Sequence, residues 1–443
     1  MFVALLPLLW QSLAASMASF LHQRSAWRLL PLLAGLLFAQ GRRRTVTSWL
    51  RAGGLQDDFA GHYYFLGSLG RRHTLPAAIL LRHALQLLPA DGPLVFALDD
   101  TPTKRYGRKV QGAGVHRNPS PGPADAPYLY GHVWVTLSLL VTHPLWGPIA
   151  LPLRALLYVR QKDLPRVPAR YRWAFRTKLE LAGDLLSWAA GMACFSGRRQ
   201  EIVVDGAYAK KPFLRQAAQA GVVVISRLRR DAGLRSLPRP RRSGQRGRPA
   251  IYGSAAIRLT LRAGQGRGWQ TVRVRQYRED RDKRLKSFEA TWRPASGRIR
   301  VVLVQEGHSW LAYFSTDPAM TAEQVLTRAA DRMAIEQTFH DLKEVEGLGQ
   351  AQVRDIWSNV GVTELTLWQH TLVELWAWDQ PKEALCDRSG SPWDDPERRP
   401  SHADRRKALQ RRCLEQEYQR RCQEQTLLPE MQQFVKQLLQ RVA

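Results

Sequence analysis

Short apolar runs bounded by turn residues recur in the first half of the chain and predict buried strands. Five runs have the composition of such strands: 93–98, 128–141, 147–160, 202–204 and 222–225. Two segments of helical character separate the later runs, at 171–193 and 209–218. The order is therefore three strands, helix, strand, helix, strand. It predicts an α/β sheet whose first three strands are hairpin neighbours and whose helix-linked strands run parallel.

The first 21 residues carry no charge, which raises the question of a membrane segment. Pro7 and Gln11 interrupt the apolar run, and the basic start of a signal peptide is missing. Leu5, Leu9 and Leu13 recur at helical spacing. We therefore expect a buried amphipathic helix here and no membrane segment.

Polar and apolar residues alternate in segments of 254–315, which predicts the strands of an inserted β domain. An Arg-, Pro- and Gly-rich stretch at 229–253 precedes them and is expected to be a linker. It contains RGRP at 246–249, which is similar to the DNA-contacting core of an AT-hook. For the charged helical tail at 405–442, dimerisation, DNA contact and capping of the core all stay open.

These patterns predict five parts of the chain. They are a helical N-terminal domain for DNA binding or dimerisation (1–92), the first part of the α/β core (93–228), the inserted β domain with its linker (229–317), the second part of the core (318–380) and a basic helical C-terminal region (381–443).

The charge balance indicates a polyanionic partner. The 443 residues include 66 Lys and Arg but only 38 Asp and Glu, a formal net charge of +28. Basic residues are spread along the whole chain, which favours a long binding surface for nucleic acid. An anionic membrane surface is the competing partner. The four cysteines contain no CxxC pair, which argues against a zinc finger and fits a reducing cytosol.

Carboxylates follow two of the predicted strands. Asp99 and Asp100 come directly after 93–98, and Asp205 comes directly after 202–204. Two adjacent carboxylates at the end of a buried strand are costly unless something binds them. A single Asp in such a place is also a common turn or helix cap, so capping remains an alternative for Asp205.

A third carboxylate lies on the predicted helix RMAIEQTFHDLK. At about 100° per residue, Arg332, Glu336 and Lys343 fall within roughly 40° of one another on one face. Asp317 or Thr321 can cap this helix. A carboxylate flanked by two cations suits a place where a metal and a phosphate backbone meet. The alternative is a surface helix with ordinary ion pairs.

The spacing of Arg332, Glu336 and Lys343 resembles the YREK signature of DDE-superfamily bacterial insertion-sequence transposases. That signature reads Tyr, two residues, Arg, three residues, Glu, six residues, Lys; here Ala329 stands in the Tyr position. The resemblance implies an RNase H-like catalytic core, a mixed sheet flanked by helices. It also implies that Asp99, Asp205 and Glu336 are the catalytic carboxylates, with Asp100 as the alternative to Asp99.

In such a transposase the three carboxylates hold two Mg²⁺ or Mn²⁺ ions. The enzyme uses them to cut transposon ends and to join the freed 3′-hydroxyl to target DNA. The residues expected to contact DNA are Arg332, Lys343, Lys104, Arg105, Arg227, Arg246, Arg248 and Trp269. The expected partner is double-stranded DNA, bound by a homodimer in the bacterial cytoplasm at the nucleoid. Two alternatives stay open, a catalytically silent DNA-binding protein derived from a transposase and an RNase H-like nuclease that cuts without joining.

Overall fold

The structure is a computed structural model. It describes residues 6–18, 26–39, 43–86, 92–118, 126–193, 197–241, 247–276, 279–386, 388, 391, 393–395, 397–423 and 431. Within these residues, no helix is both long enough and apolar enough to cross a membrane.

Five strands form the centre of the molecule: β1 (Leu94–Lys104), β3 (Tyr128–His143), β4 (Gly147–Tyr158), β5 (Gln200–Val204) and β6 (Val223–Leu228). Their order across the sheet is β4, β3, β1, β5, β6. β3 is antiparallel to β1 and β4, whereas β1, β5 and β6 run parallel. The short β2 (Gly114–Arg117) pairs with the start of β3. This mixed sheet confirms the predicted RNase H-like α/β fold.

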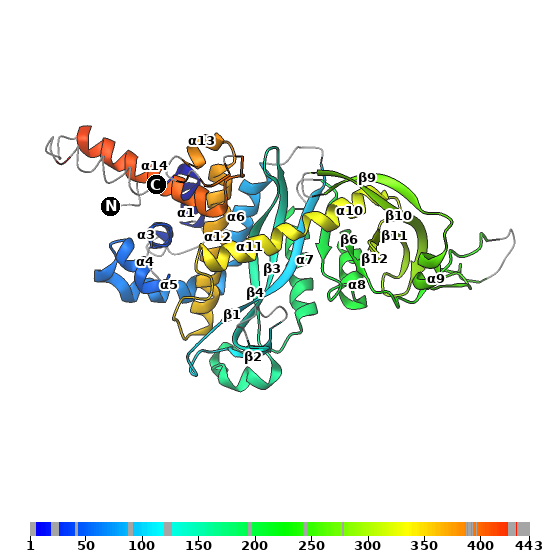
Figure 1. Cartoon of the computed structure of the whole chain (residues 1–443). Coiled ribbons are helices and arrows are strands. Elements are labelled where there is room, and N and C mark those ends of the chain that lie inside the picture. Colours follow the sequence, from blue (N-terminus) through cyan, green and yellow to red (C-terminus); the bar gives the residue numbers. More distant parts are fainter. Residues whose placement is uncertain are drawn as a thin grey trace.

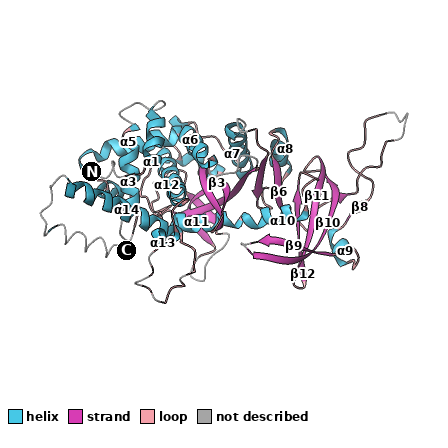
Figure 2. Ribbon diagram, turned by 90° about the horizontal axis from the view of Figure 1, so that it is seen from above, coloured by secondary structure: helices cyan, strands magenta, loops and turns pink. Residues whose placement is uncertain are grey.

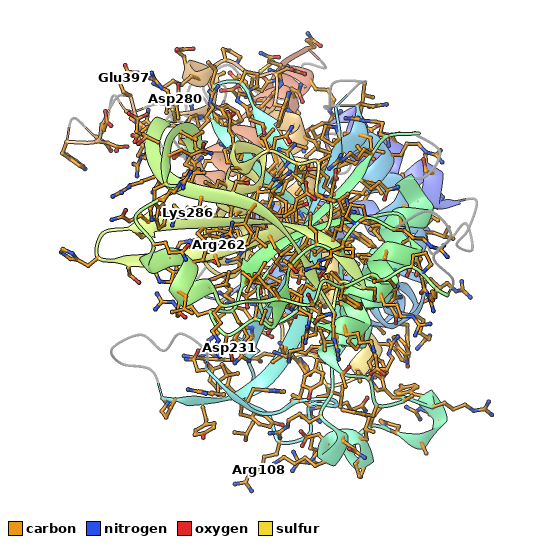
Figure 3. The ribbon with its side chains drawn as sticks, turned by 90° about the vertical axis from the view of Figure 1, so that its right-hand side faces the viewer. Arg108, Asp231, Arg262, Asp280, Lys286 and Glu397 are labelled. Atoms are coloured by element: carbon orange, nitrogen blue, oxygen red, sulfur yellow. The ribbon has the colours of Figure 1, made fainter. Side chains whose placement is uncertain are left out.

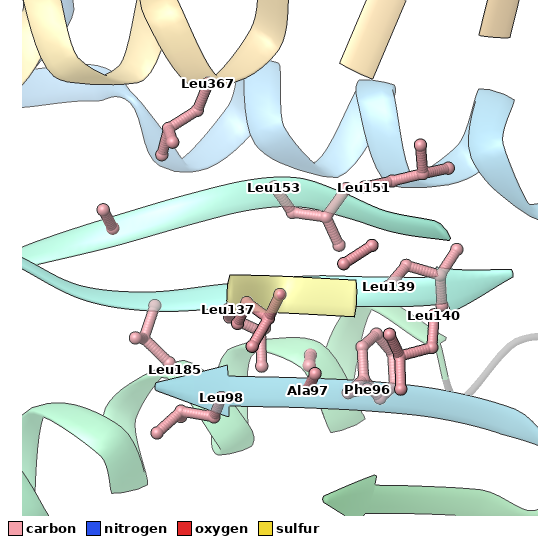
Figure 4. Packing of buried hydrophobic residues seen from close by; sticks show 14 of the residues in the cluster. Phe96, Ala97, Leu98, Leu137, Leu139, Leu140, Leu151, Leu153, Leu185 and Leu367 are labelled. Atoms are coloured by element: carbon pink, nitrogen blue, oxygen red, sulfur yellow. The ribbon is translucent and has the colours of Figure 1, made fainter. Parts of the chain in front are cut away.

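Helices cover this sheet. They are α7 (Lys178–Ala193), α8 (Lys211–Gln219), α11 (Met333–Glu344) and α12 (Ile356–Ala377). Phe96 and Leu98 of β1 pack with leucines of β3 and β4, Leu185 of α7 and Leu367 of α12 in one continuous core (Figure 4). The predicted helix at 171–193 starts later than expected, at Lys178. The 3₁₀ turns Gln161–Arg166 and Ala169–Tyr171 come before it, Arg172 has a positive φ of 48°, and residues 172–177 form no helix.

Helix α12 closes the outer edge of β4 with polar side chains. Glu364 accepts the Ala155 N–H at 3.0 Å, and the Trp368 indole donates to the Leu153 carbonyl at 3.0 Å. The Thr371 hydroxyl donates to the Pro152 carbonyl at 2.6 Å. The free backbone groups of an open strand edge can pair with a strand of another chain. Here side chains of α12 bond such groups of β4.

The inserted strands extend the central sheet. Antiparallel pairing of β12 with β6 joins them, giving one sheet of 12 strands among the residues that the structure describes. The added elements are β7 (Leu234–Arg235), β8 (Ala256–Ile257), α9 (Leu259–Gly264), β9 (Gln270–Gln276), β10 (Glu279–Trp292), β11 (Gly297–Glu306) and β12 (Ser309–Ser315). Figure 1 shows this extension at one end of the molecule and the terminal helices at the other.

Helices from both ends of the chain gather beside α12. They are α1 (Leu8–Ala18), α3 (Leu29–Phe38), α4 (Val46–Ala52), α5 (Phe59–Arg72), α6 (Thr74–Leu85), α13 (Lys382–Leu385) and α14 (His402–Gln423), with a 3₁₀ turn at Gln56–Asp58. Trp10 and Leu13 of α1 are fully buried, and the Trp10 indole donates to Gln369 of α12 at 3.2 Å. The described part of the uncharged N-terminal stretch is thus a buried helix, as predicted; Leu5 lies outside the described residues.

Candidate carboxylate site

Asp99 and Asp100 lie inside strand β1, not after it. The strand continues to Lys104, five residues beyond Asp99, because its second half still pairs with β3. Successive side chains of a strand point to opposite faces of the sheet. Asp99 meets Arg332, which directly precedes α11, whereas Asp100 meets Lys178 at the start of α7. The two carboxylates therefore serve different faces.

Arg332 joins the first and third carboxylates. Its Nη1 donates to Asp99 Oδ2 at 2.6 Å and its Nη2 donates to Glu336 Oε1 at 2.9 Å. Arg332 sits where α10 (Ala322–Asp331) gives way to α11, so the predicted helix is two helices that meet at this residue. Thr321 caps α10, with its hydroxyl accepting the Gln324 N–H at 3.1 Å. Figure 2 shows both helices running from the inserted strands to the terminal helices.

Asp205 follows β5 at the level of Asp99. The parallel pairing of β1 with β5 ends with Leu98 opposite Val204, so the next residues along the two strands are Asp99 and Asp205. Asp205 does not cap α8, which begins six residues later at Lys211. Its Oδ2 accepts the Ala207 N–H at 3.1 Å in the turn after the strand. The turn thus holds the second carboxylate beside the first.

The electrostatics of the site favour a bound cation. Burial raises the pKa of Asp99 to about 6; the Arg332 guanidinium opposes this rise, and the carboxylates of Asp100 and Asp205 add to it. A buried carboxylate with acidic neighbours is stabilised by positive charge, which Arg332 supplies here. Carboxylate oxygens are the ligands that Mg²⁺ and Mn²⁺ prefer. The donor set of Asp99, Asp205 and Glu336 therefore fits divalent cations.

Asp100 has partners that sequence reasoning missed. The Tyr208 hydroxyl donates to its Oδ1 at 2.7 Å, and Lys178 Nζ lies 2.6 Å from its Oδ2. Burial and the neighbouring Asp100 raise the pKa of Tyr208, so this phenol stays protonated as a donor. Tyr208 stands three residues after Asp205, and this proximity in the sequence is a weak sign that it belongs to the site. Nothing in the sequence around Lys178 indicates that it pairs with Asp100.

Two glycines turn the chain back against β1 after α11. Gly347 and Gly349 have φ of +80° and +89°, a conformation that other residues rarely adopt. A Cβ at Gly349 would lie 2.9 Å from the Thr103 Cβ, so the loop could not approach as closely with any side chain there. The returning loop shapes one wall of a cavity of about 820 Å³ beyond the carboxylates.

This cavity gathers several of the cations that were expected to bind DNA. Lys343 and Lys104 line it together with Arg43 and Arg354. Burial lowers the pKa of Lys343, and the Glu344 carboxylate opposes this while Lys104 adds to it. Lys343 lies two turns after Glu336 on α11. The basic cavity therefore lies along the same side of α11 as Glu336, the third carboxylate.

Arg105, another of the expected DNA contacts, is buried. Its Nε donates to His132 Nδ1 at 3.2 Å, and its Nη1 donates to the carbonyls of Gly349, at 3.0 Å, and Ala351. Only 6% of the residue is exposed. Arg105 thus ties β1 and β3 to the loop after α11, and it also lines the cavity beside Lys104, so a DNA contact by Arg105 stays a prediction.

The other expected DNA contacts are spread over the molecule. Arg227 is exposed on β6, and its backbone lies beside Gly206, next to Asp205. Trp269 is half-buried, with Lys286 Nζ 4.9 Å from its ring centroid. Figure 3 shows Lys286 beside Arg262 on the inserted part, where Lys286 Nζ donates to the Arg262 carbonyl at 2.7 Å. Arg248 is exposed far along the linker, and Arg246 lies outside the described residues.

Comparison with known proteins identifies the family. The family described as "DDE superfamily endonuclease" matches residues 17–294. Asp99 and Asp205 lie inside the matched residues, whereas Glu336 lies beyond them and joins the site through Arg332. No curated protein matches the chain. Because the match spans more than half of the sequence and contains the two strand carboxylates, the chain belongs to the DDE superfamily endonucleases.

Proposed function

We propose that the chain is a DNA transposase that cuts the ends of a mobile element and joins the freed 3′-hydroxyl to target DNA. One observation carries this proposal above the others. A single guanidinium, that of Arg332, bonds both Asp99 and Glu336 beside Asp205, which supports one site made from three distant segments.

Asp99, Asp205 and Glu336 are the proposed ligands of two Mg²⁺ or Mn²⁺ ions. When bound, such ions lower the pKa of an attacking water or 3′-hydroxyl and stabilise the leaving oxygen. Asp99 is half-buried, and this partial burial strengthens the interaction of its carboxylate with positive charge. The turn at Asp205 and the helix at Glu336 hold the other two carboxylates at fixed places.

The chain's cations have a second proposed task. Arg332 and Lys343 hold the phosphates that flank the cut, since a guanidinium can pair with two phosphate oxygens at once. The basic cavity lined by Lys104, Lys343, Arg43 and Arg354 receives the adjoining DNA. Exposed basic residues elsewhere, Arg227 and Arg248 among them, extend this track, and Trp269 is the proposed aromatic contact. The proposed active form is a homodimer on double-stranded DNA at the bacterial nucleoid.

A strand-transfer assay tests the proposal. Labelled double-stranded DNA that carries the ends of the encoding element is incubated with the full chain, target plasmid and Mg²⁺ or Mn²⁺. A transposase yields plasmid covalently joined to the label, and omission of metal abolishes the product. Cut ends without joined product, over varied metals and end sequences, would replace the proposal with a nuclease. Binding without any cut would replace it with a silent DNA-binding protein.

A further inference from the structure

A second group of metal-ligating side chains lies apart from the carboxylate site. His370 and Glu374 stand one turn apart on α12, and His402 begins α14. One potential ligand atom from each lies within 4.8 Å of the other two. The three residues are 2%, 1% and 3% exposed. Glutamate and histidine from two helices thus converge in the interior.

His370 provides an independent sign of a missing ligand. Neither of its ring nitrogens has a hydrogen-bond partner among the described residues, although the side chain is buried. A buried polar group without a hydrogen-bond partner destabilises the folded state. Its ring stacks on that of His402, with centroids 4.0 Å apart and an angle of 16° between the ring planes.

His402 already has the surroundings of a metal-binding histidine. One ring nitrogen, Nδ1, lies 2.7 Å from Glu374 Oε1, and the other, Nε2, lies 2.9 Å from Glu346 Oε1. Metal-bound histidines commonly donate their second ring N–H to a carboxylate, which fixes the ring. Glu346 is in place for that role. Arg405 bonds the second oxygen of Glu374, so Glu374 Oε1 is the oxygen that faces His402.

Space for an ion lies beside the three side chains. A cavity of about 220 Å³ is lined by His370, Glu374 and His402 together with Gln337 and Asp341 of α11. On α11, Gln337 and Asp341 lie about 100–140° around the helix from Glu336. The cavity is therefore separate from the carboxylate site and lies on another side of the same helix.

We propose that His370, His402 and Glu374 bind one Zn²⁺ ion that fastens the C-terminal helix to α12. Two imidazoles and a carboxylate suit zinc better than magnesium, which prefers oxygen ligands alone. Tetrahedral ligand atoms at about 2.0 Å from zinc lie roughly 3.3 Å apart, so the side chains must move from their present spacing of up to 4.8 Å, and one imidazole must tilt out of the stack, when the ion binds. The ion is distinct from the catalytic cations, and the proposal does not depend on transposase activity.

The test measures zinc bound to the full chain. Purified protein is stripped with a chelator, given excess Zn²⁺ and desalted, and metal per chain is determined by mass spectrometry beside thermal unfolding. We expect wild type to retain zinc and to unfold about 2–5 °C higher with it. His370→Leu should retain one ion fewer and lose this rise. Its zinc-free form should be at least as stable as zinc-free wild type, because two unpaired nitrogens are gone.

Two controls assign the loss to this site. His340→Leu removes an exposed histidine of α11, and the double variant Asp99→Asn with Glu336→Gln changes the carboxylate site. Both should keep the zinc-dependent rise. Wild type that retains no zinc and shows no rise would overturn the proposal, leaving an ion-free network in which His402 bridges Glu346 and Glu374. Equal zinc retention by His370→Leu would also overturn it, and if that variant does not fold, the wild-type stoichiometry decides.

Discussion

Arg332 Nη1 and Asp99 Oδ2 are 2.6 Å apart, although 233 positions separate the two residues in the chain. This ion pair links the middle strand of the sheet to the junction of α10 and α11. The same guanidinium reaches Glu336, one turn into α11. The pair therefore fixes which carboxylate of β1 shares a site with the third carboxylate, and four predictions depend on it or on its surroundings.

Arg332→Met should lower the rate of DNA cleavage by about 10–100-fold, because two carboxylates lose the group that orients them. It should also move the acidic limb of the pH–rate profile upward. Ionised Asp99 is the proposed metal ligand, its pKa is raised to about 6, and Arg332 holds that pKa down. Single-turnover cleavage from pH 5 to 9 measures both effects. Arg328→Met, which removes one of the two arginines paired with Glu201, is the matched control. An unmoved limb in Arg332→Met would contradict the assignment.

Asp99→Asn should abolish cleavage yet stabilise the fold at pH 7. Since the folded-state pKa of Asp99 is raised from 3.8 to about 6, the native state binds more protons than the unfolded state between these values. Stability therefore falls as pH rises through this window, and the asparagine avoids that loss. Thermal unfolding should show a gain of roughly 1–3 kcal/mol at pH 7 that vanishes below about pH 4.

Asp331→Asn is the control for that stability effect. Burial also raises the pKa of Asp331 to about 6, although the charged group beside it is Arg328 and not a carboxylate of the site. It should show a similar gain in stability with cleavage retained. A Tm of Asp99→Asn below that of wild type at pH 7 would count against the electrostatic account.

Asp100→Asn should retain most cleavage activity, in contrast to Asp99→Asn. Asp100 bonds Tyr208 and Lys178 on the other face of β1, so its loss disturbs packing and not the proposed metal ligands. Single-turnover rates should fall less than tenfold for Asp100→Asn and more than about 10³-fold for Asp99→Asn. The reverse order would exchange the roles of the two residues.

Arg105→Met and Lys343→Gln should separate folding from DNA contact. Loss of the Arg105 guanidinium leaves the carbonyls of Gly349 and Ala351 and the Nδ1 of His132 without this donor. The free energy of unfolding should therefore fall by about 2–4 kcal/mol. Lys343→Gln should change stability little and lower the salt dependence of DNA binding by about one unit of slope. Binding titrations over a range of salt, beside denaturant unfolding, measure both. A reduced salt slope in Arg105→Met would show that its side chain reaches DNA.

The sequence alone predicts the five long central strands and the buried run before Asp99 and before Asp205, because both depend on local patterns. It predicts neither β2 nor the continuation of β1 past Asp99. In each case a buried apolar run leads into an acidic residue, Asp99 or Asp205. The parallel pairing of β1 with β5 then places the two residues next to each other. The alternation of side chains along β1 is equally local. Local patterns do not predict which face of β1 lies against Arg332 and Glu336. That depends on packing between segments far apart in the chain.

The differences from the sequence-based predictions have the same origin. Arg105 looks like part of an exposed basic loop, but a loop from beyond Gly347 returns to cover it. The inserted strands have a β pattern that does not reveal their pairing with β6. The spacing of His370 and Glu374 on one helix is visible in the sequence, whereas His402 joins them only through the docking of α14.

The most direct test of the central claim compares Mg²⁺-dependent nicking by wild type, Asp205→Ala and Glu336→Ala on the same element-end DNA. DNA binding is measured for each protein as the control for folding. We expect both variants to bind DNA and to nick it more than about 10³-fold more slowly than wild type, because each loses a ligand of one shared site. Nicking at the wild-type rate by either variant, with binding retained, would contradict the claim that these carboxylates act together.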